Sequence, residues 1–210
     1  RSPQTRGFAQ DVTDGGTMYL DDLRRALSGA ESEIGSLEMD IIAFDTCYMS
    51  TIEVMYQVSP WANYGLGAQD QQPFYGMNYT YTSQMGYNAS LTPESLVSMA
   101  VEVYSGTYDV SSDPWAGLSA VDLRSLRYNL TPSLDRLARN ITGRMYHLEV
   151  ERQGAFYQAH VLAERIGGSY KRIDLGDLLY WINERNLDDT ITSLSKDALL
   201  IYNDTIVNEY

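Results

Sequence analysis

The sequence predicts an α/β protein in which helices cover both faces of a mostly parallel central sheet, a three-layer α/β/α architecture. Short apolar runs of the kind found in buried strands alternate along the chain with longer stretches whose apolar residues recur at helical spacing. A length of 210 residues is enough for one domain with a sizeable core. We therefore expect a single layered domain and find no internal repeat.

The beginning of the chain predicts a loose end followed by a helix. Residues 1–16 are rich in glycine and have few apolar side chains, so we expect a flexible N-terminal segment there, before a domain that occupies residues 17–210. From about Tyr19, apolar residues share one helix face. Asp21 and Asp22 fall in the first turn of this helix, where acidic side chains complement the helix dipole.

The stretch from Asp40 to Val58 combines a predicted buried strand with the only cysteine of the chain. The apolar run that ends at Phe44 is typical of a strand in a parallel sheet, and the residues after Cys47 have helical spacing. Cys47 is therefore expected at the sheet edge where open α/β folds place reactive groups. A helix N-terminus favours a thiolate, which suits a nucleophile, although a lone cysteine is also common as a small buried hydrophobe.

The rest of the chain continues the alternation and then becomes mainly helical. Residues 63–68 predict a short strand, and residues 69–89 predict a long, tyrosine-rich loop of the kind that is more often functional than accidental. Residues 92–104 have the start signals and the apolar face of a helix. A strand is expected from Trp115 to Val121, and the mainly helical C-terminal part begins at about residue 130.

The residues around Cys47 resemble the catalytic segment of the clostripain-like cysteine peptidases. The run Phe44-Asp45-Thr46-Cys47-Tyr48-Met49, with Glu53 and Val54 in the next helix, is similar to the family pattern Phe-Asp-x-Cys-Leu-Met and its following hydrophobe-Glu-Val. Other stretches look like later family motifs, namely residues 64–70, 73–79, 118–123 and 173–178. The resemblance extends over roughly residues 13–182, and the cysteine segment is its most specific part.

This resemblance implies a caspase-like fold and a Cys-His dyad that cleaves peptide bonds after arginine or lysine. Cys47 matches the nucleophile, and residues 17–210 would be the cysteine-bearing part of a single caspase-like peptidase domain. Asp45 matches the acidic residue at the floor of the pocket for the basic side chain, where a carboxylate can hold an arginine with two hydrogen bonds. An aspartate that only ends a strand or caps a helix is the alternative for Asp45.

Several positions depart from the family pattern. Tyr48 stands in place of the usual leucine after the cysteine. Ala68 and Gln69 stand where the family tends to have Ser-Glu, which changes the expected shape and charge of the substrate pocket. Asp70 could supply the lost charge one position further along, although aspartates are ordinary in exposed loops.

The general base is missing from its expected place. In caspase-type folds the histidine lies about 50 residues before the cysteine, which here falls at or before Arg1. His147 and His160 follow the cysteine and neither precedes a glycine, as the family's histidine does, so we expect both to be ordinary residues. The resemblance therefore implies a histidine on an upstream segment, or on an N-terminal chain cut from the same precursor by self-processing.

Composition and charge exclude several other classes of protein. A net charge of -13 and a pI near 4.4 argue against nucleic acid and anionic membranes as partners and favour the approach of basic peptides. No apolar run reaches the roughly 18 residues of a membrane-spanning helix. No Cys/His cluster or EF-hand spacing predicts a metal site. Some relatives require calcium, so calcium stays open as a cofactor without an assigned ligand.

Several Asn-x-Ser/Thr sequons favour an extracellular or cell-surface glycoprotein, because glycans are added at such sites only on exported proteins. They lie at Asn78, Asn88, Asn129, Asn140 and Asn203. A chain rich in serine and threonine also produces such tripeptides by chance.

We therefore expect a cysteine endopeptidase that cleaves after arginine or lysine. The main alternative is a catalytically inactive surface glycoprotein of the same fold that binds peptides or protein partners. A third interpretation, a ligand-binding α/β domain with an inert cysteine, predicts that Cys47 is buried.

Overall fold

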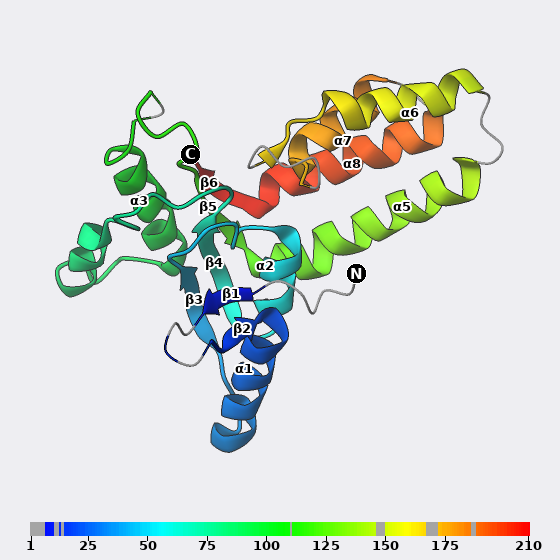
Figure 1. The fold of residues 1–210 in the computed structure, drawn as a ribbon. Coiled ribbons are helices and arrows are strands. Elements are labelled where there is room, and N and C mark those ends of the chain that lie inside the picture. The colour runs from blue at the N-terminus through cyan, green and yellow to red at the C-terminus, as the bar shows by residue number, and fades with distance from the viewer. Residues whose placement is uncertain are drawn as a thin grey trace. The chain divides into compact units, whose positions relative to one another are not determined.

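Figure 1 shows the computed structural model of the chain, which describes residues 7–10, 13, 15–109, 111–145, 150–166, 172–185 and 188–210. The chain divides into two compact units. Residues 1–123 and 207–210 form the first, which we call the sheet unit, and residues 124–206 form the second, which we call the helical unit. The sheet unit contains both Cys47 and Asp45.

The sheet unit is built from short strands alternating with helices. Its elements are β1 (Gly7–Gln10), β2 (Thr17–Tyr19), α1 (Leu20–Ile34), β3 (Met39–Phe44), α2 (Ile52–Val58), β4 (Ala62–Ala68), the 3-10 helix η2 (Tyr79–Gly86), α3 (Pro93–Ser105), β5 (Leu118–Asp122) and β6 (Ile206–Glu209). Strands β1 and β2 form a separate antiparallel ribbon. Strand β1 falls within the predicted flexible segment, of which residues 1–6, 11, 12 and 14 lie outside the described residues.

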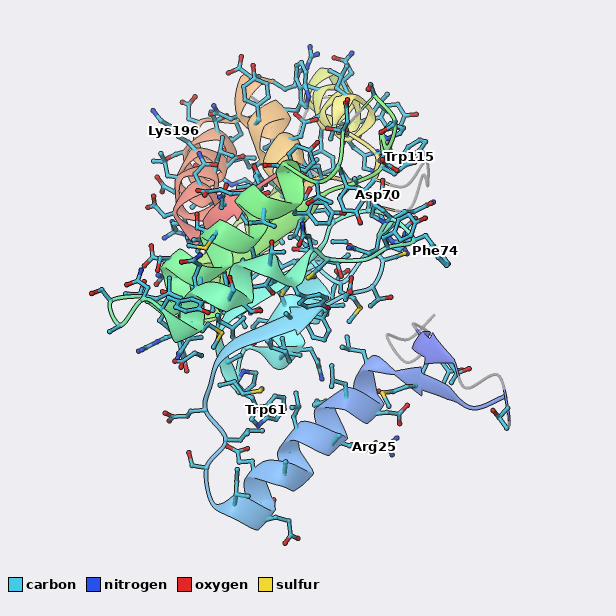
Figure 2. The ribbon with its side chains drawn as sticks, turned by 90° about the vertical axis from the view of Figure 1, so that its left-hand side faces the viewer. Arg25, Trp61, Asp70, Phe74, Trp115 and Lys196 are labelled. Atoms are coloured by element: carbon cyan, nitrogen blue, oxygen red, sulfur yellow. The ribbon has the colours of Figure 1, made fainter. Side chains whose placement is uncertain are left out.

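Helix α1 begins and ends with capping contacts that the sequence encodes. The Asp22 carboxylate accepts a hydrogen bond of 2.8 Å from the backbone N–H of Tyr19, and Gly35 ends the helix with a φ of 82°. These bounds confirm the helix predicted from about Tyr19. The indole N–H of Trp61 donates to Glu31 at 2.9 Å and ties α1 to the start of β4 (Figure 2).

The main sheet is mixed, with strand order β3-β4-β5-β6. Strands β3 and β4 are parallel because helix α2 connects them as a crossover, whereas β4 and β5 are antiparallel. Leu118 in β5 and Tyr210 exchange two backbone hydrogen bonds of 3.1 and 3.0 Å, the pattern of an antiparallel pair. The prediction of a mostly parallel sheet is therefore not confirmed. Apolar runs indicate burial, and burial does not fix the direction in which a strand runs.

Helices lie on both faces of strand β4, which gives the sheet unit its layers. Leu66 packs in the cluster under α3, while its neighbours Gly65 and Gly67 turn to the opposite face. A Cβ atom at Gly65 would lie 2.4 Å from Sδ of Met55 in α2. Glycine at this position therefore lets α2 pack directly on the strand.

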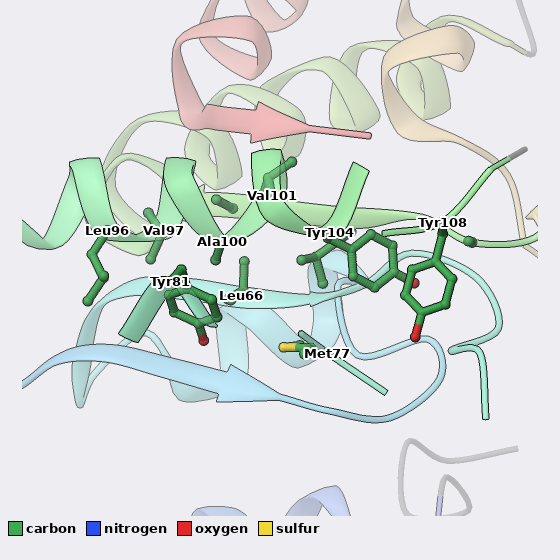
Figure 3. Packing of buried hydrophobic residues seen from close by; sticks show 12 residues of the cluster. Leu66, Met77, Tyr81, Leu96, Val97, Ala100, Val101, Tyr104 and Tyr108 are labelled. Carbon is green, nitrogen blue, oxygen red and sulfur yellow. The ribbon is translucent and has the colours of Figure 1, made fainter. Parts of the chain in front are cut away.

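The core of the sheet unit fills the space between α3 and the sheet, as Figure 3 shows. Helix α3 starts with Thr92 as its N-cap and Pro93 in its first turn, which confirms the predicted start. Its apolar face packs against β4, β5 and the loop before η2. The buried members of this cluster are Leu66, Met77, Tyr81, Leu96, Val97, Ala100, Val101, Tyr104, Tyr108, Ala116, Leu118 and Ala120.

The helical unit has its own apolar core. Its elements are α4 (Leu123–Ser125), the π-helical turn η3 (Leu126–Leu130), α5 (Thr131–Met145), α6 (Val150–Leu162), α7 (Leu175–Glu184) and α8 (Asp189–Thr205). The buried residues of this core are Leu137, Ala159, Leu179, Ile182, Ile191, Leu194 and Ala198. None of the helices in the described part of the chain is long and apolar enough to span a membrane.

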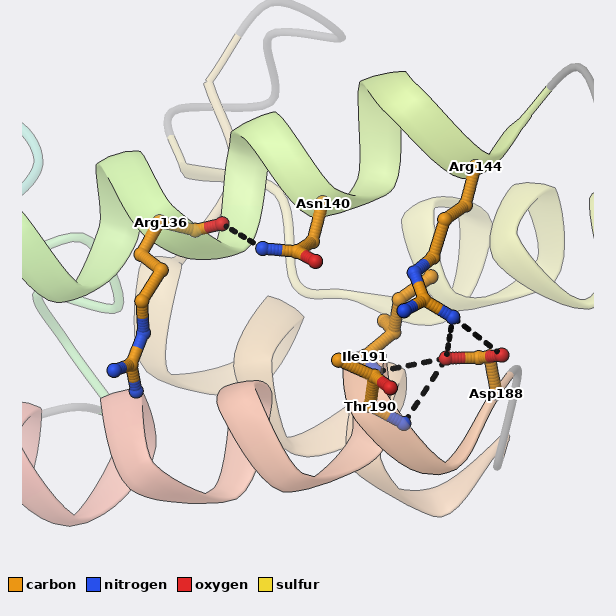
Figure 4. Close-up of polar contacts among 6 residues, drawn as sticks. All are labelled: Arg136, Asn140, Arg144, Asp188, Thr190 and Ile191. Carbon is orange, nitrogen blue, oxygen red and sulfur yellow. Dashed lines mark hydrogen bonds and ion pairs between the residues drawn. The ribbon is translucent and has the colours of Figure 1, made fainter.

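Asp188 joins two helices of this unit at the start of α8, as Figure 4 shows. Its carboxylate accepts hydrogen bonds from the backbone N–H groups of Thr190 and Ile191 at 3.0 and 3.3 Å. Arg144 of α5 donates to the same carboxylate at 3.0 and 3.1 Å. Burial alone would raise the pKa of Asp188, but these hydrogen bonds and the Arg144 charge lower it overall.

Candidate active site

Cys47 lies in a tight turn between β3 and α2, at the end of the sheet where β3 and β4 both finish. The side chain is exposed and the cysteine is free. The position agrees with the junction that the sequence predicts. This exposure contradicts the interpretation of Cys47 as a small buried hydrophobe. An exposed thiol is also accessible to substrates and reagents.

The segment after β4 holds this turn in place. The backbone N–H of Tyr48 donates to the carbonyl of Asp70 at 2.9 Å, and that of Ser50 donates to the carbonyl of Ala68 at 3.0 Å. The N–H of Gln72 donates to the Cys47 sulfur at 3.2 Å. The nucleophile candidate is therefore fixed by backbone contacts from the end of β4 and the segment after it.

Tyr48 has a φ of 61°, in the left-handed region that residues with a Cβ rarely adopt. This conformation costs roughly 1–2 kcal/mol, and such strain concentrates at functional sites. The strained residue follows Cys47 directly. The turn thereby directs the sulfur outward while Met49 is buried.

Asp45 is fixed by the loop that follows β4. Its Oδ1 accepts a hydrogen bond from the backbone N–H of Met77, and its Oδ2 accepts one from the hydroxyl of Tyr79, each at 2.9 Å. Gly76 has a φ of 68°, and a Cβ atom there would lie 2.5 Å from Oδ2 of Asp45. The loop can approach the carboxylate only because residue 76 is glycine.

Several tyrosines surround the Asp45 carboxylate. Burial and the hydrogen bond to Asp45 raise the pKa of Tyr79 to about 12, so its hydroxyl stays protonated and continues to donate. Burial also raises the pKa of Tyr81, Tyr104 and Tyr108, and the Asp45 charge contributes in each case. Burial is the larger cause of these shifts, and the negative charge of Asp45 adds to it by opposing a second negative charge nearby.

Gln69 and Asp70 each make a hydrogen bond in the structure. Gln69 donates from its side chain to Glu209 at 3.2 Å, and Oδ1 of Asp70 accepts from the backbone N–H of Gln71 at 2.7 Å. Ala68 is fully buried at the end of β4. The Asp70 carboxylate thus stabilises its own loop.

His160 lies in α6 of the helical unit, where Nη2 of Arg165 approaches its Nδ1 at 3.4 Å and donates to its carbonyl at 2.8 Å. His147 lies outside the described residues. Within the described part of the sheet unit there is therefore no histidine beside Cys47. The same described residues contain no group of three or more acidic, histidine or cysteine side chains that could hold a metal ion.

The sequon asparagines have different environments. The side-chain amides of Asn78, Asn129 and Asn140 donate hydrogen bonds within the fold, to Thr107, Ser125 and Arg136 respectively. Asn203 lies within helix α8. Asn88 is exposed in the loop after η2, and its side-chain oxygen accepts from the N–H of Ser90 at 3.0 Å. Of these positions, Asn88 has the open loop setting that a glycan needs.

Sequence reasoning missed three features of this site: the Gln72 contact with the sulfur, the strain at Tyr48, and the hydrogen bonds of Met77 and Tyr79 to Asp45. The length and tyrosine content of residues 69–89 were the one available signal, and they located the right loop. The hydrogen bonds themselves join residues 25 to 34 positions apart, which no local pattern encodes.

Solved structures share this fold. A clostripain from Bacteroides thetaiotaomicron in complex with the peptide inhibitor BTN-VLTK-AOMK matches with a TM-score of 0.61 and 22% identity, over 97% of this chain and 79% of that one. A secreted cysteine protease from the same species, in complex with an irreversible peptide inhibitor, matches with a TM-score of 0.65 and 18% identity, over 100% of this chain and 53% of that one. An inactive zymogen protease from Parabacteroides distasonis matches with a TM-score of 0.57 and 18% identity, over 91% of this chain and 47% of that one.

No curated protein sequence matches this chain. The model of the clostripain family does match, and its match extends over residues 1–210. That match covers every residue of the chain, including Cys47 and Asp45. The chain therefore belongs to the clostripain family of cysteine peptidases.

Proposed function

We propose that this chain is the cysteine-bearing part of an endopeptidase that cleaves after arginine or lysine. The observation that carries the proposal is the pairing of an exposed, backbone-fixed Cys47 with the Asp45 carboxylate two residues earlier. The first supplies a nucleophile and the second supplies an anchor for a positive side chain. Both groups lie at the same end of the sheet.

In this proposal the Cys47 thiolate attacks the carbonyl carbon of the scissile bond, and a histidine takes the thiol proton. Backbone N–H groups, that of Cys47 among them, stabilise the negative oxygen of the tetrahedral intermediate. The intermediate collapses to a thioester as the histidine passes its proton to the leaving amine. Water then attacks the thioester, with the same histidine as base, and releases the new carboxylate and the thiol.

Asp45 would hold the basic side chain that precedes the cut. Each carboxylate oxygen can accept two hydrogen bonds. Oδ1 accepts one from Met77 and Oδ2 accepts one from Tyr79, so a second lone pair on each oxygen can accept from a guanidinium or ammonium group. The acidic net charge of -13 favours the approach of basic peptides. The peptide inhibitor bound to the Bacteroides thetaiotaomicron clostripain, BTN-VLTK-AOMK, has a lysine (K) directly before its AOMK group.

The histidine would come from an upstream segment or an N-terminal chain of the same precursor. Strand β3 has a neighbour on one side only among the described strands, so its other edge can pair with a further strand beside Cys47. His160 follows Cys47 in the chain and no glycine follows it, unlike the family's histidine, so we assign the base to another segment. The zymogen state of the Parabacteroides distasonis protease is in keeping with self-processing.

We also propose that the protein works outside the cell, as the secreted cysteine protease from Bacteroides thetaiotaomicron does. Asn88 is then the first position at which a glycan would be sought, because its loop is exposed. Calcium remains a proposed cofactor of the complete enzyme, without an assigned ligand in this chain.

The test is labelling of the full-length natural protein, with its upstream histidine and with calcium supplied, by an arginyl chloromethyl ketone. Mass spectrometry of the peptides should find one label, on Cys47. Asp45→Asn keeps the size of the side chain but removes its charge, so we expect it to abolish labelling by this reagent while iodoacetamide still alkylates Cys47. Asp70→Asn, two residues before Gln72, serves as the control and should label like the natural protein.

An absence of labelling under these conditions would refute the peptidase and favour a surface glycoprotein that binds peptides without cleaving them. Labelling that is equal in Asp45→Asn and the natural protein would keep the peptidase but refute Asp45 as the basic-side-chain anchor.

A further inference from the structure

The turn from Pro73 to Gly76, which we call the aromatic turn, presents two large side chains to solvent. Phe74 is 97% exposed and Tyr75 is 88% exposed, and their rings meet edge to face with centroids 5.6 Å apart. Figure 2 shows Phe74 projecting away from the ribbon. Two adjacent aromatic residues that bury almost nothing contribute nothing to the core, and exposed apolar groups of this kind mark binding surfaces.

The backbone of the aromatic turn is firmly held. The N–H of Gly76 donates to the carbonyl of Pro73 at 2.9 Å, and the hydroxyl of Tyr108 donates to the carbonyl of Gly76 at 2.6 Å. Tyr108 and Met77, the residue after the turn, are both buried in the core. Because the turn is already ordered, a ligand that binds its rings loses little of its affinity to ordering of the protein.

The two ends of the aromatic turn lie against the two key groups of the site. Gln72, immediately before the turn, donates its N–H to the Cys47 sulfur at 3.2 Å. Met77, immediately after it, donates its N–H to Asp45 at 2.9 Å. The turn therefore spans the distance from the attacking sulfur to the anchor of the basic side chain.

A substrate that places its scissile carbonyl at Cys47 and its basic side chain at Asp45 must run past this turn. An extended peptide advances roughly 3.3–3.6 Å per residue, so the residues that flank the basic one lie within one or two such steps of the two anchors. Their side chains are the parts of the substrate that can reach Phe74 and Tyr75.

We propose that Phe74 and Tyr75 form an apolar subsite that binds a large aliphatic or aromatic side chain next to the basic residue at the cut. The proposal rests on the proposed function of Cys47 and Asp45. It assigns a second element of specificity to the enzyme, in addition to the charge of Asp45. Peptides with a leucine or phenylalanine beside the basic residue are the preferred substrates.

The test compares peptides in which arginine is fixed before the cut and each flanking position is varied among phenylalanine, leucine and serine. For the full-length enzyme we expect kcat/KM to be about ten-fold higher with phenylalanine or leucine than with serine at one flanking position. Phe74→Ala and Tyr75→Ala should each reduce this ratio toward one. Tyr87→Ala is the matched control, because Tyr87 is also 88% exposed but lies after η2, and it should keep the full ratio.

The outcomes separate this inference from the proposed function. A chloromethyl ketone of arginine alone has no flanking side chain, so its labelling of Cys47 tests only the nucleophile and Asp45. If that label forms but the natural enzyme shows no apolar preference, or if both alanine variants keep the preference, the subsite is refuted and the peptidase stands. If the label does not form, both proposals fail.

Discussion

The hydroxyl of Tyr79 donates a hydrogen bond of 2.9 Å to Oδ2 of Asp45, across 34 positions of sequence. This contact, with that of Met77 to Oδ1, fixes the orientation of the carboxylate at the end of β3. It also joins the loop after β4 to the residue two positions before Cys47. The bond thus connects the stability of the loop with the geometry of the site.

Tyr79→Phe tests the energetic value of this bond. The ring can keep its stacked contact with Tyr81, so the variant loses mainly the hydroxyl. We expect the free energy of unfolding to fall by about 1 kcal/mol, the usual net contribution of one such hydrogen bond. Urea denaturation followed by circular dichroism measures it, and a variant as stable as the natural protein would show that the bond contributes nothing.

The same tyrosine predicts a dependence of stability on alkaline pH. The pKa of Tyr79 is raised from 10.0 to about 12, so above pH 10 the unfolded chain loses this proton while the folded chain keeps it. The stabilisation is therefore complete below pH 10 and is lost as pH rises toward 12. Other tyrosines titrate in this range too. The contribution of Tyr79 is the extra decline that the natural protein shows relative to Tyr79→Phe, and parallel curves for the two would contradict it.

Gly76→Ala tests whether the loop needs glycine against Asp45. Alanine at a φ of 68° costs roughly 1–2 kcal/mol, and its Cβ would also collide with the carboxylate. Gly35→Ala is the control, since Gly35 has a φ of 82° but nothing within 4 Å of the added atom. We expect similar backbone strain in both.

Only Gly76→Ala should also lower kcat/KM for arginyl substrates, by about 10- to 100-fold, because it displaces Asp45. Denaturation curves and kinetics of the two variants together decide the point. Equal losses of activity in both variants would mean that strain alone, and not the position of Asp45, controls the site.

Gln72→Pro tests the hydrogen bond to the sulfur, because proline removes the backbone N–H that Gln72 donates to Cys47. We expect alkylation of Cys47 by iodoacetamide to slow by about ten-fold, the equivalent of one hydrogen bond. Gln72→Ala keeps the N–H and removes a side-chain amide whose buried atoms have no hydrogen-bond partner among the described residues, so its rate should match the natural protein. Equal slowing in both variants would assign the effect to the side chain instead.

Asp188 should dominate the stability of the start of α8. Asp188→Ala removes the acceptor for the N–H groups of Thr190 and Ile191, and loss of such a cap costs about 1 kcal/mol. Arg144→Ala leaves those bonds in place, and since Arg144 is 43% exposed its ion pair contributes less than about 1 kcal/mol. Urea denaturation should therefore rank Asp188→Ala as the less stable variant. The opposite order would assign the main contribution to the ion pair.

The sequence predicted correctly those features that depend on near neighbours in the chain. The apolar run before Asp45 and the helical spacing after Cys47 placed the cysteine at a strand end, where the structure has it. Tyr19 and Thr92 marked the starts of two helices, because capping contacts lie within three residues. The motif around Cys47 indicated the family that the match over the whole chain then established.

Other features depended on which distant segments pack together, and no local pattern could supply them. The direction of β5 relative to β4 follows from the path of the chain through η2 and α3, and the two strands are antiparallel. An apolar run predicts a buried strand whether that strand is parallel or antiparallel to its neighbour, so the sequence did not predict a mixed sheet.

The sequence by itself determined the chemistry that this protein carries: one cysteine after a buried strand, and an aspartate two residues before it. Only the tertiary structure decided that the cysteine is exposed, that Gln72 contacts its sulfur, and that Tyr79 and Met77 hold the aspartate. The physical reason is the separation in sequence between the residues that interact. Helix and strand signals arise from interactions over a few residues, whereas the orientation of a reactive side chain is set by hydrogen bonds and packing from parts of the chain that meet only after folding.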